Sequence, residues 1–327
     1  LQTTIAKTLN SPLVLKERGS FYVGGEKTKQ DFVELGSLRE ADTVTNNQMF
    51  VEYMIANTQN PKIPLVLIHG AGLSGNSYDT TPDGRMGWYE YFVRKYFPTY
   101  IVDQVGRGRS GFNQEIFNNV GAGRTEPSQL PKITRMGDLH AVWINFRIGE
   151  KEGIPFKDTQ FPINAISEFS KMSIADLASN LASPNPNYKT LAKLAKKLKG
   201  AVLIGHSQSG HYPLESALIE PNYVKGMIIL EGSCSPRPFN DNDFEVFKKI
   251  PLLVIYGDYL FGSTELPFGD SWQQRYDKCQ IFVDKVNEKG GNAEIIHLPQ
   301  KGFKGNSHMF MMDKNLSLIH ISEPTRQ

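Results

Sequence analysis

Short apolar runs recur along the chain, and their lengths and spacing predict strands rather than helices. Most of these runs contain no polar position, which is typical of strands that are buried on both faces of a sheet. Residues 48–55 instead alternate apolar and polar positions, as a half-buried strand does. The continuous runs lie at residues 65–68, 100–102, 201–204, 226–230 and 252–256, and one further strand is expected at 293–298.

Helical patterns separate these runs. The expected helices lie at residues 86–96, 174–198, 211–219 and 272–289, with Pro184 and Pro186 interrupting the second. Strands that alternate with helices favour a mostly parallel central sheet with helices on both faces. In such a sheet, functional groups gather at the carboxyl ends of the strands.

Residues 111–172 break this alternation, since they carry several Pro, Gly and Asn and have weak periodicity. We interpret them as an insertion that caps the functional edge of a single α/β domain at 1–327; a surface excursion without a role is the alternative. The tail at 316–327 is too short, and too interrupted by Pro324, to be the amphipathic helix that should cover the last strand. We expect this tail to be non-native and the genuine C-terminal helix to be missing.

The bulk composition argues against several classes of function. The 36 Lys and Arg against 34 Asp and Glu leave a net charge of +2, which gives no support for nucleic-acid binding. No apolar run approaches the roughly 20 residues that a membrane helix needs. The chain starts at Leu1 without a signal-like segment, so we expect a removed leader and a secreted or periplasmic protein. In an exported protein Cys234 and Cys279 can form one disulfide, although the sequence alone does not place them in contact.

The run at 201–204 leads into Gly205-His206-Ser207-Gln208-Ser209-Gly210, which has the pattern G-x-S-x-G. A buried strand, a very tight turn and a helix at this pattern form a nucleophile elbow, which presents a serine at the strand end. Gly205 and Gly210 are expected where strand and helix approach too closely for larger side chains. Ser207 is therefore the candidate nucleophile.

A serine hydroxyl needs a base to accept its proton, and histidine has a suitable pKa. Among the seven histidines, His308 lies in a loop after the last strand, where the chain order serine, acid, histidine places the base. His206 is adjacent to Ser207, and we expect its side chain to point away from the reacting face. His69 belongs to a strand-end turn and is expected to brace loops.

A carboxylate must hold the imidazole and stabilise its charged form. Glu231 follows the strand after the elbow, and Asp258 follows the next strand, which is the commoner place. Glutamate reaches one methylene further, which suits an acid that is one strand nearer to the nucleophile. Spacing alone leaves both candidates open, and the carboxylate that is not used can cap a loop.

An oxyanion needs hydrogen-bond donors that are fixed in advance. The backbone N–H of Gln208, directly after the nucleophile, is one candidate, and Ala71 in the loop at 69–72 is the other. No P-loop, dinucleotide fingerprint, H-E-x-x-H or paired C-x-x-C is present, so the sequence predicts neither a cofactor nor a metal.

Six motifs between residues 69 and 309 resemble the α/β-hydrolase superfamily and, within it, a branch of bacterial and fungal serine esterases typified by an Alcaligenes enzyme, and the resemblance covers most of residues 19–315. The string at 80–88 is the most specific of them. The motifs are His69-Gly70-x-x-Leu73-Ser74-Gly75, Thr80-Thr81-Pro82-Asp83-Gly84-Arg85-Met86-Gly87-Trp88, Asp103-Gln104-x-Gly106-Arg107-Gly108-Arg109-Ser110, the elbow, Leu230-Glu231-Gly232 and Asn306-Ser307-His308-Met309.

The resemblance implies that the acid is the glutamate after the sixth strand, which favours Glu231 over Asp258. It also implies a covered pocket, excretion and a tendency to form homodimers. One departure concerns the oxyanion loop, where the typical member of the branch has two adjacent cysteines and this chain has Ala71 and Gly72. Substrate preference is therefore not carried over.

Together these features predict a serine carboxylic-ester hydrolase that acts on a small-molecule ester through an acyl-enzyme intermediate. A lactonase or another acyl hydrolase with the same catalytic residues is the alternative among enzymes. A non-catalytic small-molecule binding protein of this fold is the other class. The complete set of Ser207, His308 and a carboxylate argues against that reading, because a receptor does not need all three.

Overall fold

The computed structural model describes residues 11–261 and 269–315, so the tail expected to be non-native lies outside the described residues. Its main element is an eight-stranded sheet of order β1-β2-β4-β3-β7-β8-β9-β10. The strands are β1 (Leu15–Leu35), β2 (Leu38–Ala56), β3 (Leu65–Ile68), β4 (Thr99–Asp103), β7 (Ala201–His206), β8 (Val224–Leu230), β9 (Leu252–Tyr256) and β10 (Ala293–His297).

The six strands from β4 to β10 in the sheet are parallel, and only β1 and β2 run antiparallel to their neighbours. Within this parallel part, His206 of β7 lies opposite Leu230 of β8. The next residue of each strand therefore emerges at the same edge of the sheet. Strand register thus makes Ser207 and Glu231 neighbours, although 24 positions separate their numbers in the chain.

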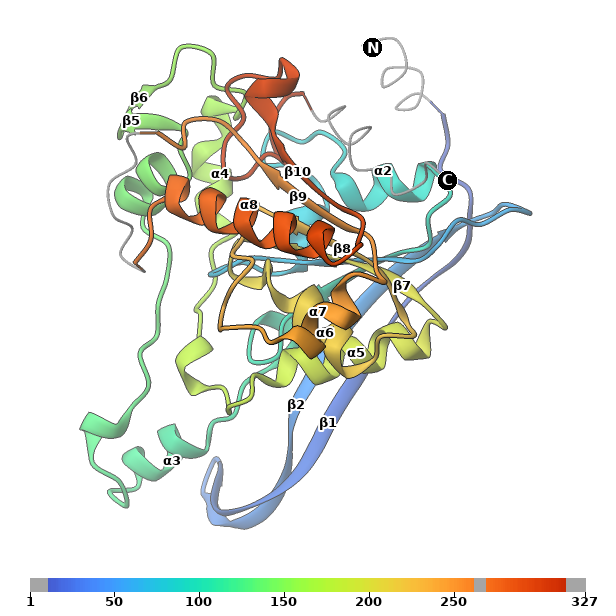
Figure 1. The fold of residues 1–327 in the computed structure, drawn as a ribbon. Coiled ribbons are helices and arrows are strands. Elements are labelled where there is room, and N and C mark those ends of the chain that lie inside the picture. Colours follow the sequence, from blue (N-terminus) through green and yellow to red (C-terminus); the bar gives the residue numbers. More distant parts are fainter. Residues whose placement is uncertain (1–10, 262–268, 316–327) are drawn as a thin grey trace.

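Helices cover both faces of the sheet, as the sequence pattern predicts. The principal ones are α2 (Trp88–Arg94), α5 (Pro186–Lys197), α6 (Tyr212–Ile219), α7 (Asp241–Phe247) and α8 (Trp272–Glu288). One buried apolar cluster joins the sheet to α5, α6, α7 and α8, and a second joins it to α2 and to part of the insertion. Figure 1 shows α5 and α6 on one side of the sheet and α2 on the other.

The expected helix at 174–198 is shorter in the structure, where the α-helix begins only at Pro186. Proline fits the first turn of a helix but not its interior, because it has no N–H and its ring clashes with the preceding turn. Asn185 caps the helix by accepting a hydrogen bond from the N–H of Asn187 at 3.0 Å. Residues 174–185 are thereby left free to form a loop, and this loop reaches the active-site edge.

The first two strands form a hairpin, and both are far longer than the strands expected at 21–25 and 48–55. They have 21 and 19 residues, yet only residues 50–54 of β2 pair with β4. The remainder extends away from the sheet toward α3 (Glu115–Gly121), as Figure 1 shows. The Gln30 amide donates to Asn113 Oδ1 at 2.9 Å, which ties the hairpin to the start of the insertion.

The insertion at 111–172 has an exposed outer part and a packed inner part. No residue at 112–133 is buried. The inner part contains the π-helix η4 (Asp138–Asn145), a small hairpin of β5 (Gly149–Lys151) and β6 (Ile154–Pro155), and α4 (Ile166–Lys171). Aromatic side chains such as Phe161 and Phe169 are fully buried in the second apolar cluster. Movement of this segment as a lid stays a prediction.

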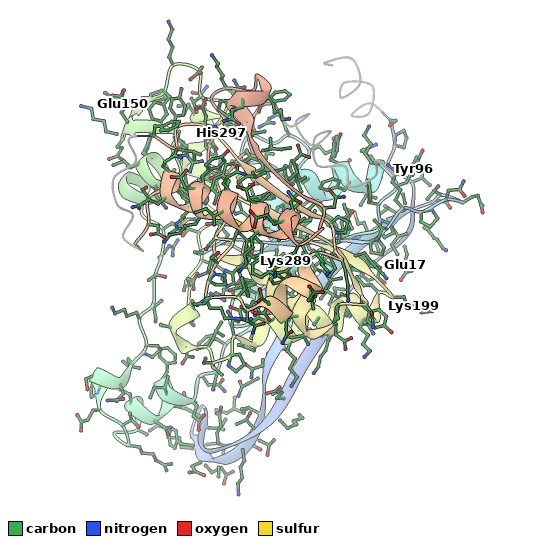
Figure 2. All side chains as sticks on the ribbon, in the orientation of Figure 1. Glu17, Tyr96, Glu150, Lys199, Lys289 and His297 are labelled. Atoms are coloured by element: carbon green, nitrogen blue, oxygen red, sulfur yellow. A yellow bond between two sulfur atoms is a disulfide. The ribbon has the colours of Figure 1, made fainter. Side chains whose placement is uncertain are left out.

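The surface carries charged side chains, as Glu150 and Lys199 illustrate at the periphery of Figure 2. In the described part of the chain, no helix is both long and apolar enough to cross a membrane. Cys234 and Cys279 form a disulfide with an S–S distance of 2.04 Å. The bridge that the sequence left open is therefore present, and it connects the loop after β8 to helix α8.

Candidate active site

The site is built around the end of β7, where Ser207 has a φ of 55°. This left-handed backbone is strained for a residue with a side chain, and it is typical of a nucleophile at a strand–helix elbow. A Cβ at Gly205 would lie 2.2 Å from Ser209 O, and one at Gly210 would lie 2.6 Å from Gly232 Cα. Both glycines are therefore required by close backbone contacts, as expected.

Three predicted residues form one hydrogen-bonded chain. Ser207 Oγ lies 2.9 Å from His308 Nε2, and His308 Nδ1 lies 3.1 Å from Glu231 Oε2. With the ring proton on Nδ1, the imidazole donates to the carboxylate and leaves Nε2 as an acceptor for the serine hydroxyl. His308 and Glu231 are both almost completely buried.

Glu231 also binds a guanidinium that the sequence did not reveal. Arg147 Nη2 donates to both carboxylate oxygens, at 2.6 and 2.7 Å, and the N–H of Gly257 donates to Oε1. Burial raises the pKa of Glu231, but the charge of Arg147 and the hydrogen bonds from His308 and Arg147 outweigh it, so the pKa falls well below its usual range. The carboxylate is therefore ionised at neutral pH.

Asp258, the other candidate acid, has a different environment. Its Oδ2 accepts a hydrogen bond from the N–H of Gly305 at 2.8 Å, and its Oδ1 accepts one from the N–H of Tyr259 at 2.7 Å. The structure thus brings Glu231, and not Asp258, to His308. Asp258 caps the loop that leads to His308, which is the role considered for the unused carboxylate.

Three rings surround the imidazole of His308. Their centroids lie 4.3 Å away for Trp272, 4.7 Å for His206 and 4.9 Å for Phe146. Burial lowers the pKa of His308 to about 4, although Glu231 acts in the opposite direction. The ring is therefore neutral at neutral pH and able to accept a proton.

His206 is placed differently from the expectation that it points away from the reacting face. Its Nε2 lies 2.9 Å from the backbone oxygen of His308, and its ring lines the same cavity as Ser207. The side chain leaves the strand on the side that the His308 loop covers, so it is buried between the strand and that loop. His69 braces loops as expected, because its Nε2 accepts the N–H of Gln104 at 2.9 Å.

A cavity of about 430 Å³ opens above these residues. The loop at 70–73 lines it together with Gln208, Phe146 and Trp272. Ala71 and Gln208, the predicted oxyanion donors, thus share one cavity with Ser207. Across the described ranges, no group of three His, Cys, Asp or Glu side chains is arranged to hold a metal ion.

Comparisons with known proteins identify the family of this chain. No protein-family model matches the sequence. A bacterial esterase with an atomic-resolution structure, described as novel, is 40% identical to this chain, with a TM-score of 0.88 over 95% of both chains. The chain belongs to the esterases of the α/β-hydrolase fold. A protein of a fungal species, named probable secreted lipase phiG, is 24% identical over 94% of this chain and 93% of its own length.

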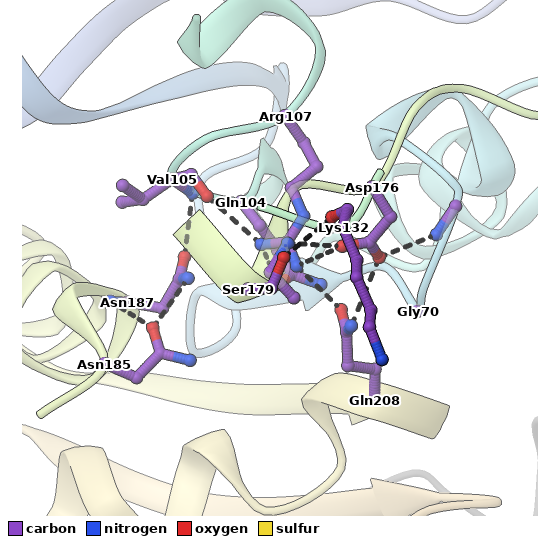
Figure 3. Close-up of polar contacts among 12 residues, drawn as sticks. Gly70, Gln104, Val105, Arg107, Lys132, Asp176, Ser179, Asn185, Asn187 and Gln208 are labelled. Atoms are coloured by element: carbon purple, nitrogen blue, oxygen red, sulfur yellow. Dashed lines mark hydrogen bonds and ion pairs between the residues drawn. The ribbon is translucent and has the colours of Figure 1, made fainter. Parts of the chain in front are cut away.

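The predicted fold and the resemblance to this esterase branch are therefore confirmed. A second buried network of this esterase includes the side chain of Gln208, the residue after Ser207, as Figure 3 shows. Arg107 Nη2 donates to Asp176 Oδ1 at 2.8 Å, and both side chains are buried. The amide of Gln208 lies between them, with Nε2 donating to Asp176 Oδ2 at 3.1 Å and Oε1 accepting from Arg107 Nη2 at 3.2 Å.

Sequence reasoning missed the partners that support the esterase's site. Arg147 follows a π-helix in a segment without clear periodicity, so its sequence gives no signal. Asp176 lies in the part of the expected helix at 174–198 that is a loop. Arg107 was visible within the motif at 103–110, but nothing in that motif indicates which carboxylate it binds.

Proposed function

We propose that the esterase is a serine carboxylic-ester hydrolase that works through an acyl-enzyme intermediate. The observation that supports this most strongly is the chain from Ser207 Oγ through the His308 ring to Glu231 Oε2, with contacts of 2.9 and 3.1 Å beside an open cavity. Such a chain is the arrangement that turns a serine hydroxyl into a nucleophile.

In this mechanism Ser207 Oγ attacks the ester carbonyl carbon while His308 Nε2 takes the hydroxyl proton. The carbonyl π electrons move to oxygen, and the N–H groups of Ala71 and Gln208 stabilise the resulting oxyanion. The tetrahedral intermediate collapses, the C–O bond to the alcohol breaks, and the alcohol leaves with the proton from His308. Water then repeats the sequence on the acyl-enzyme and releases the acid.

Glu231 is the proposed acid of the triad. It orients the ring of His308 and stabilises the imidazolium that forms during the reaction. Arg147 keeps Glu231 ionised and fixed in orientation through its two contacts from one nitrogen. Because Arg147 does not touch the reacting atoms, it is a positioning residue.

The cavity supports a small-molecule ester as substrate. Its volume of about 430 Å³ lies in the range of small-molecule pockets. Its aromatic and aliphatic lining favours an apolar acyl or alcohol group, and Leu73, Met136, Phe146 and Trp272 contribute to it. A panel of linear esters and lactones of graded length separates an esterase from a lactonase.

Export from the cytoplasm is part of the proposal. A structural disulfide forms and persists in oxidising compartments, and Cys234 and Cys279 are bridged. The fungal relative is named a probable secreted lipase. Homodimer formation stays a prediction, which sedimentation of the purified protein tests.

The decisive experiment is labelling by a fluorophosphonate probe together with hydrolysis of p-nitrophenyl butyrate. The wild-type protein is expected to be labelled on Ser207 and to hydrolyse the ester, and Ser207→Ala is expected to lose both while keeping its circular dichroism spectrum. Removing a member of a catalytic triad leaves at most about 10³- to 10⁴-fold catalysis over water. Undiminished turnover by Ser207→Ala, or a folded wild type that is not labelled, contradicts the proposal.

A further inference from the structure

The two proposed oxyanion donors come from separate loops, which raises the question of what holds them at a fixed separation. Ala71 belongs to the loop after β3, and Gln208 follows the end of β7. The donors stabilise a developing charge only if they are fixed before the reaction begins. Their supporting contacts are therefore as important as their positions.

One carboxylate oxygen bridges these loops. Asp176 Oδ2 accepts the N–H of Gly72, the residue after Ala71, at 3.1 Å. The same oxygen accepts the side-chain Nε2 of Gln208, also at 3.1 Å. Asp176 is 2% exposed, so water does not compete for these bonds. Both halves of the proposed oxyanion hole thus depend on a single atom outside it.

The other oxygen of this carboxylate is held just as firmly. Asp176 Oδ1 accepts Arg107 Nη2 and the N–H of Ala178, each at 2.8 Å. Arg107 also donates to Gln208 Oε1 at 3.2 Å. Both the oxygen and the nitrogen of the Gln208 amide are therefore hydrogen-bonded, to Arg107 and Asp176 respectively (Figure 3). The carboxylate accepts four hydrogen bonds in all, which fixes its orientation completely.

The backbone around Asp176 adds to the fixation of the Gly72 peptide. The N–H of Ile174 donates to Gly72 O at 2.8 Å, so residue Gly72 is bound at both its backbone nitrogen and its backbone oxygen. Gly72 has a φ of 65°, a conformation that turns its backbone toward the loop at 174–178.

From this geometry we propose that Asp176 and Arg107 are positioning residues that set the separation of the Ala71 and Gln208 N–H groups in the oxyanion hole. This inference rests on the proposed function, since it assigns the oxyanion to that hole. The pair acts on the rate of the chemical step and leaves proton transfer by His308 untouched, because neither residue contacts His308 or Glu231.

The test compares Asp176→Asn with Gln208→Met in the full-length protein. Asp176→Asn removes the charge that binds Arg107, and Gln208→Met removes the amide tether while keeping the backbone N–H and the buried ion pair. A displacement of about 1 Å in a reacting geometry costs about 10²-fold. We expect kcat for p-nitrophenyl butyrate to fall by about 10- to 100-fold in both variants.

The readouts separate a positioning role from a merely structural one. A trifluoromethyl ketone, which forms an oxyanion on Ser207, is expected to bind more weakly by the same factor as the loss in kcat. The matching methyl ketone, KM and the pH profile are expected to stay unchanged. The control is Glu215→Gln, which neutralises the buried carboxylate of the Glu215–Arg237 pair and is expected to keep kcat.

Thermal unfolding shows whether each variant is folded. If Asp176→Asn does not fold, Gln208→Met decides the question, because it leaves no buried charge unpaired. Unchanged kcat in folded Gln208→Met, or equal loss of affinity for both ketones, overturns the inference while the proposed function stands. A wild-type protein that fails to react with the fluorophosphonate instead overturns the proposed function.

Discussion

Two buried arginine–carboxylate pairs are connected to Ser207 through different neighbours, one through His308 and the other through Gln208. On the base side, Arg147 binds both oxygens of Glu231 through one nitrogen, at 2.6 and 2.7 Å. On the side of the proposed oxyanion hole, Arg107 donates to only one oxygen of Asp176, at 2.8 Å. The other oxygen accepts hydrogen bonds from the N–H of Gly72 and from the side-chain amide of Gln208. All four side chains are 0–2% exposed, so burial does not distinguish the two pairs.

The neighbours of the carboxylates distinguish them. Glu231 contacts the ring of His308, which gains and loses a proton during the proposed reaction, so the charge of Arg147 influences proton affinity there. Asp176 contacts backbone N–H groups, an amide and Arg107, none of which titrates near neutral pH. We therefore infer that the Arg147–Glu231 pair affects the proton affinity of His308, whereas the Arg107–Asp176 pair affects the positions of the proposed oxyanion donors.

The supports of the two sides differ as well. The base side has a covalent brace, because Cys234 follows Glu231 by three residues and is bonded to Cys279 of helix α8. That helix begins at Trp272, whose ring centroid lies 4.3 Å from that of His308 at an interplanar angle of 40°. The oxyanion side, over the residues that the structure describes, is held by hydrogen bonds and the ion pair.

The largest effect is expected for Glu231→Gln. The amide keeps the shape but does not stabilise the imidazolium of His308, so kcat should fall by about 10⁴-fold. Steady-state hydrolysis of p-nitrophenyl butyrate by folded protein measures this. Asp258→Asn is the matched control and should lose far less, because Asp258 binds only backbone N–H groups. The opposite ranking reassigns the acid.

A smaller effect, with a characteristic pH signature, is expected for Arg147→Met. Breaking a buried ion pair by removing one partner costs about 3 to 5 kcal/mol of unfolding free energy. The wild-type kcat/KM should be lost only as the pH falls through the low pKa of His308, about 4, because the base must be neutral. Without the cation of Arg147 the pKa of His308 rises, so this acid limb should move to higher pH.

Urea unfolding and a pH–rate profile check both expectations for Arg147→Met. Asp176→Asn is the matched comparison, since it also breaks a buried pair but should leave the acid limb in place. If both variants shift the limb equally, the division into a proton-tuning pair and a geometric pair is wrong.

The smallest effect on this scale is expected from removing the disulfide. In Cys234→Ala/Cys279→Ala the loop closed by the bridge, with a sequence separation of 45, becomes unconstrained. The unfolding free energy should fall by about 2 to 4 kcal/mol. Urea titrations with and without reductant measure this, and the variant itself should not respond to reductant. An unchanged midpoint for the reduced wild type would show that hydrogen bonds alone brace the base side.

The central sheet and the elbow could be predicted from sequence because their signals are local. Continuous apolar runs identified the parallel strands. The pattern around Ser207 was recognisable because Gly205 and Gly210 are required where the backbone segments approach too closely for a Cβ atom. The position of His308 followed from chain order. Strand ends in a parallel sheet meet at one edge, so the approach of Glu231 to Ser207 also has a simple cause.

The supporting shell could not be predicted because it depends on long-range contacts between irregular segments. Arg147 meets Glu231 across 84 positions, and Arg107 meets Asp176 across 69. Neither arginine lies in a pattern that indicates burial. The length of the hairpin was missed for another reason: most of it has solvent on both sides, so the apolar alternation that marks a half-buried strand appears only where it joins the sheet.

The insertion meets the active-site edge through Arg147, through Phe146 O, which accepts the N–H of His308, and through the antiparallel bridge between Thr134 and Asp176. For redesign of this enzyme, that makes the segment modular. Residues 112–133 include no buried residue, but Asn113 binds the hairpin and Asn180, and Lys132 O accepts from Ser179, so a redesign keeps these two positions and varies the loop between them. Residues 134–147 and 174–178 hold the contacts to the site. We therefore expect substitutions there to lower kcat rather than to change which esters are accepted.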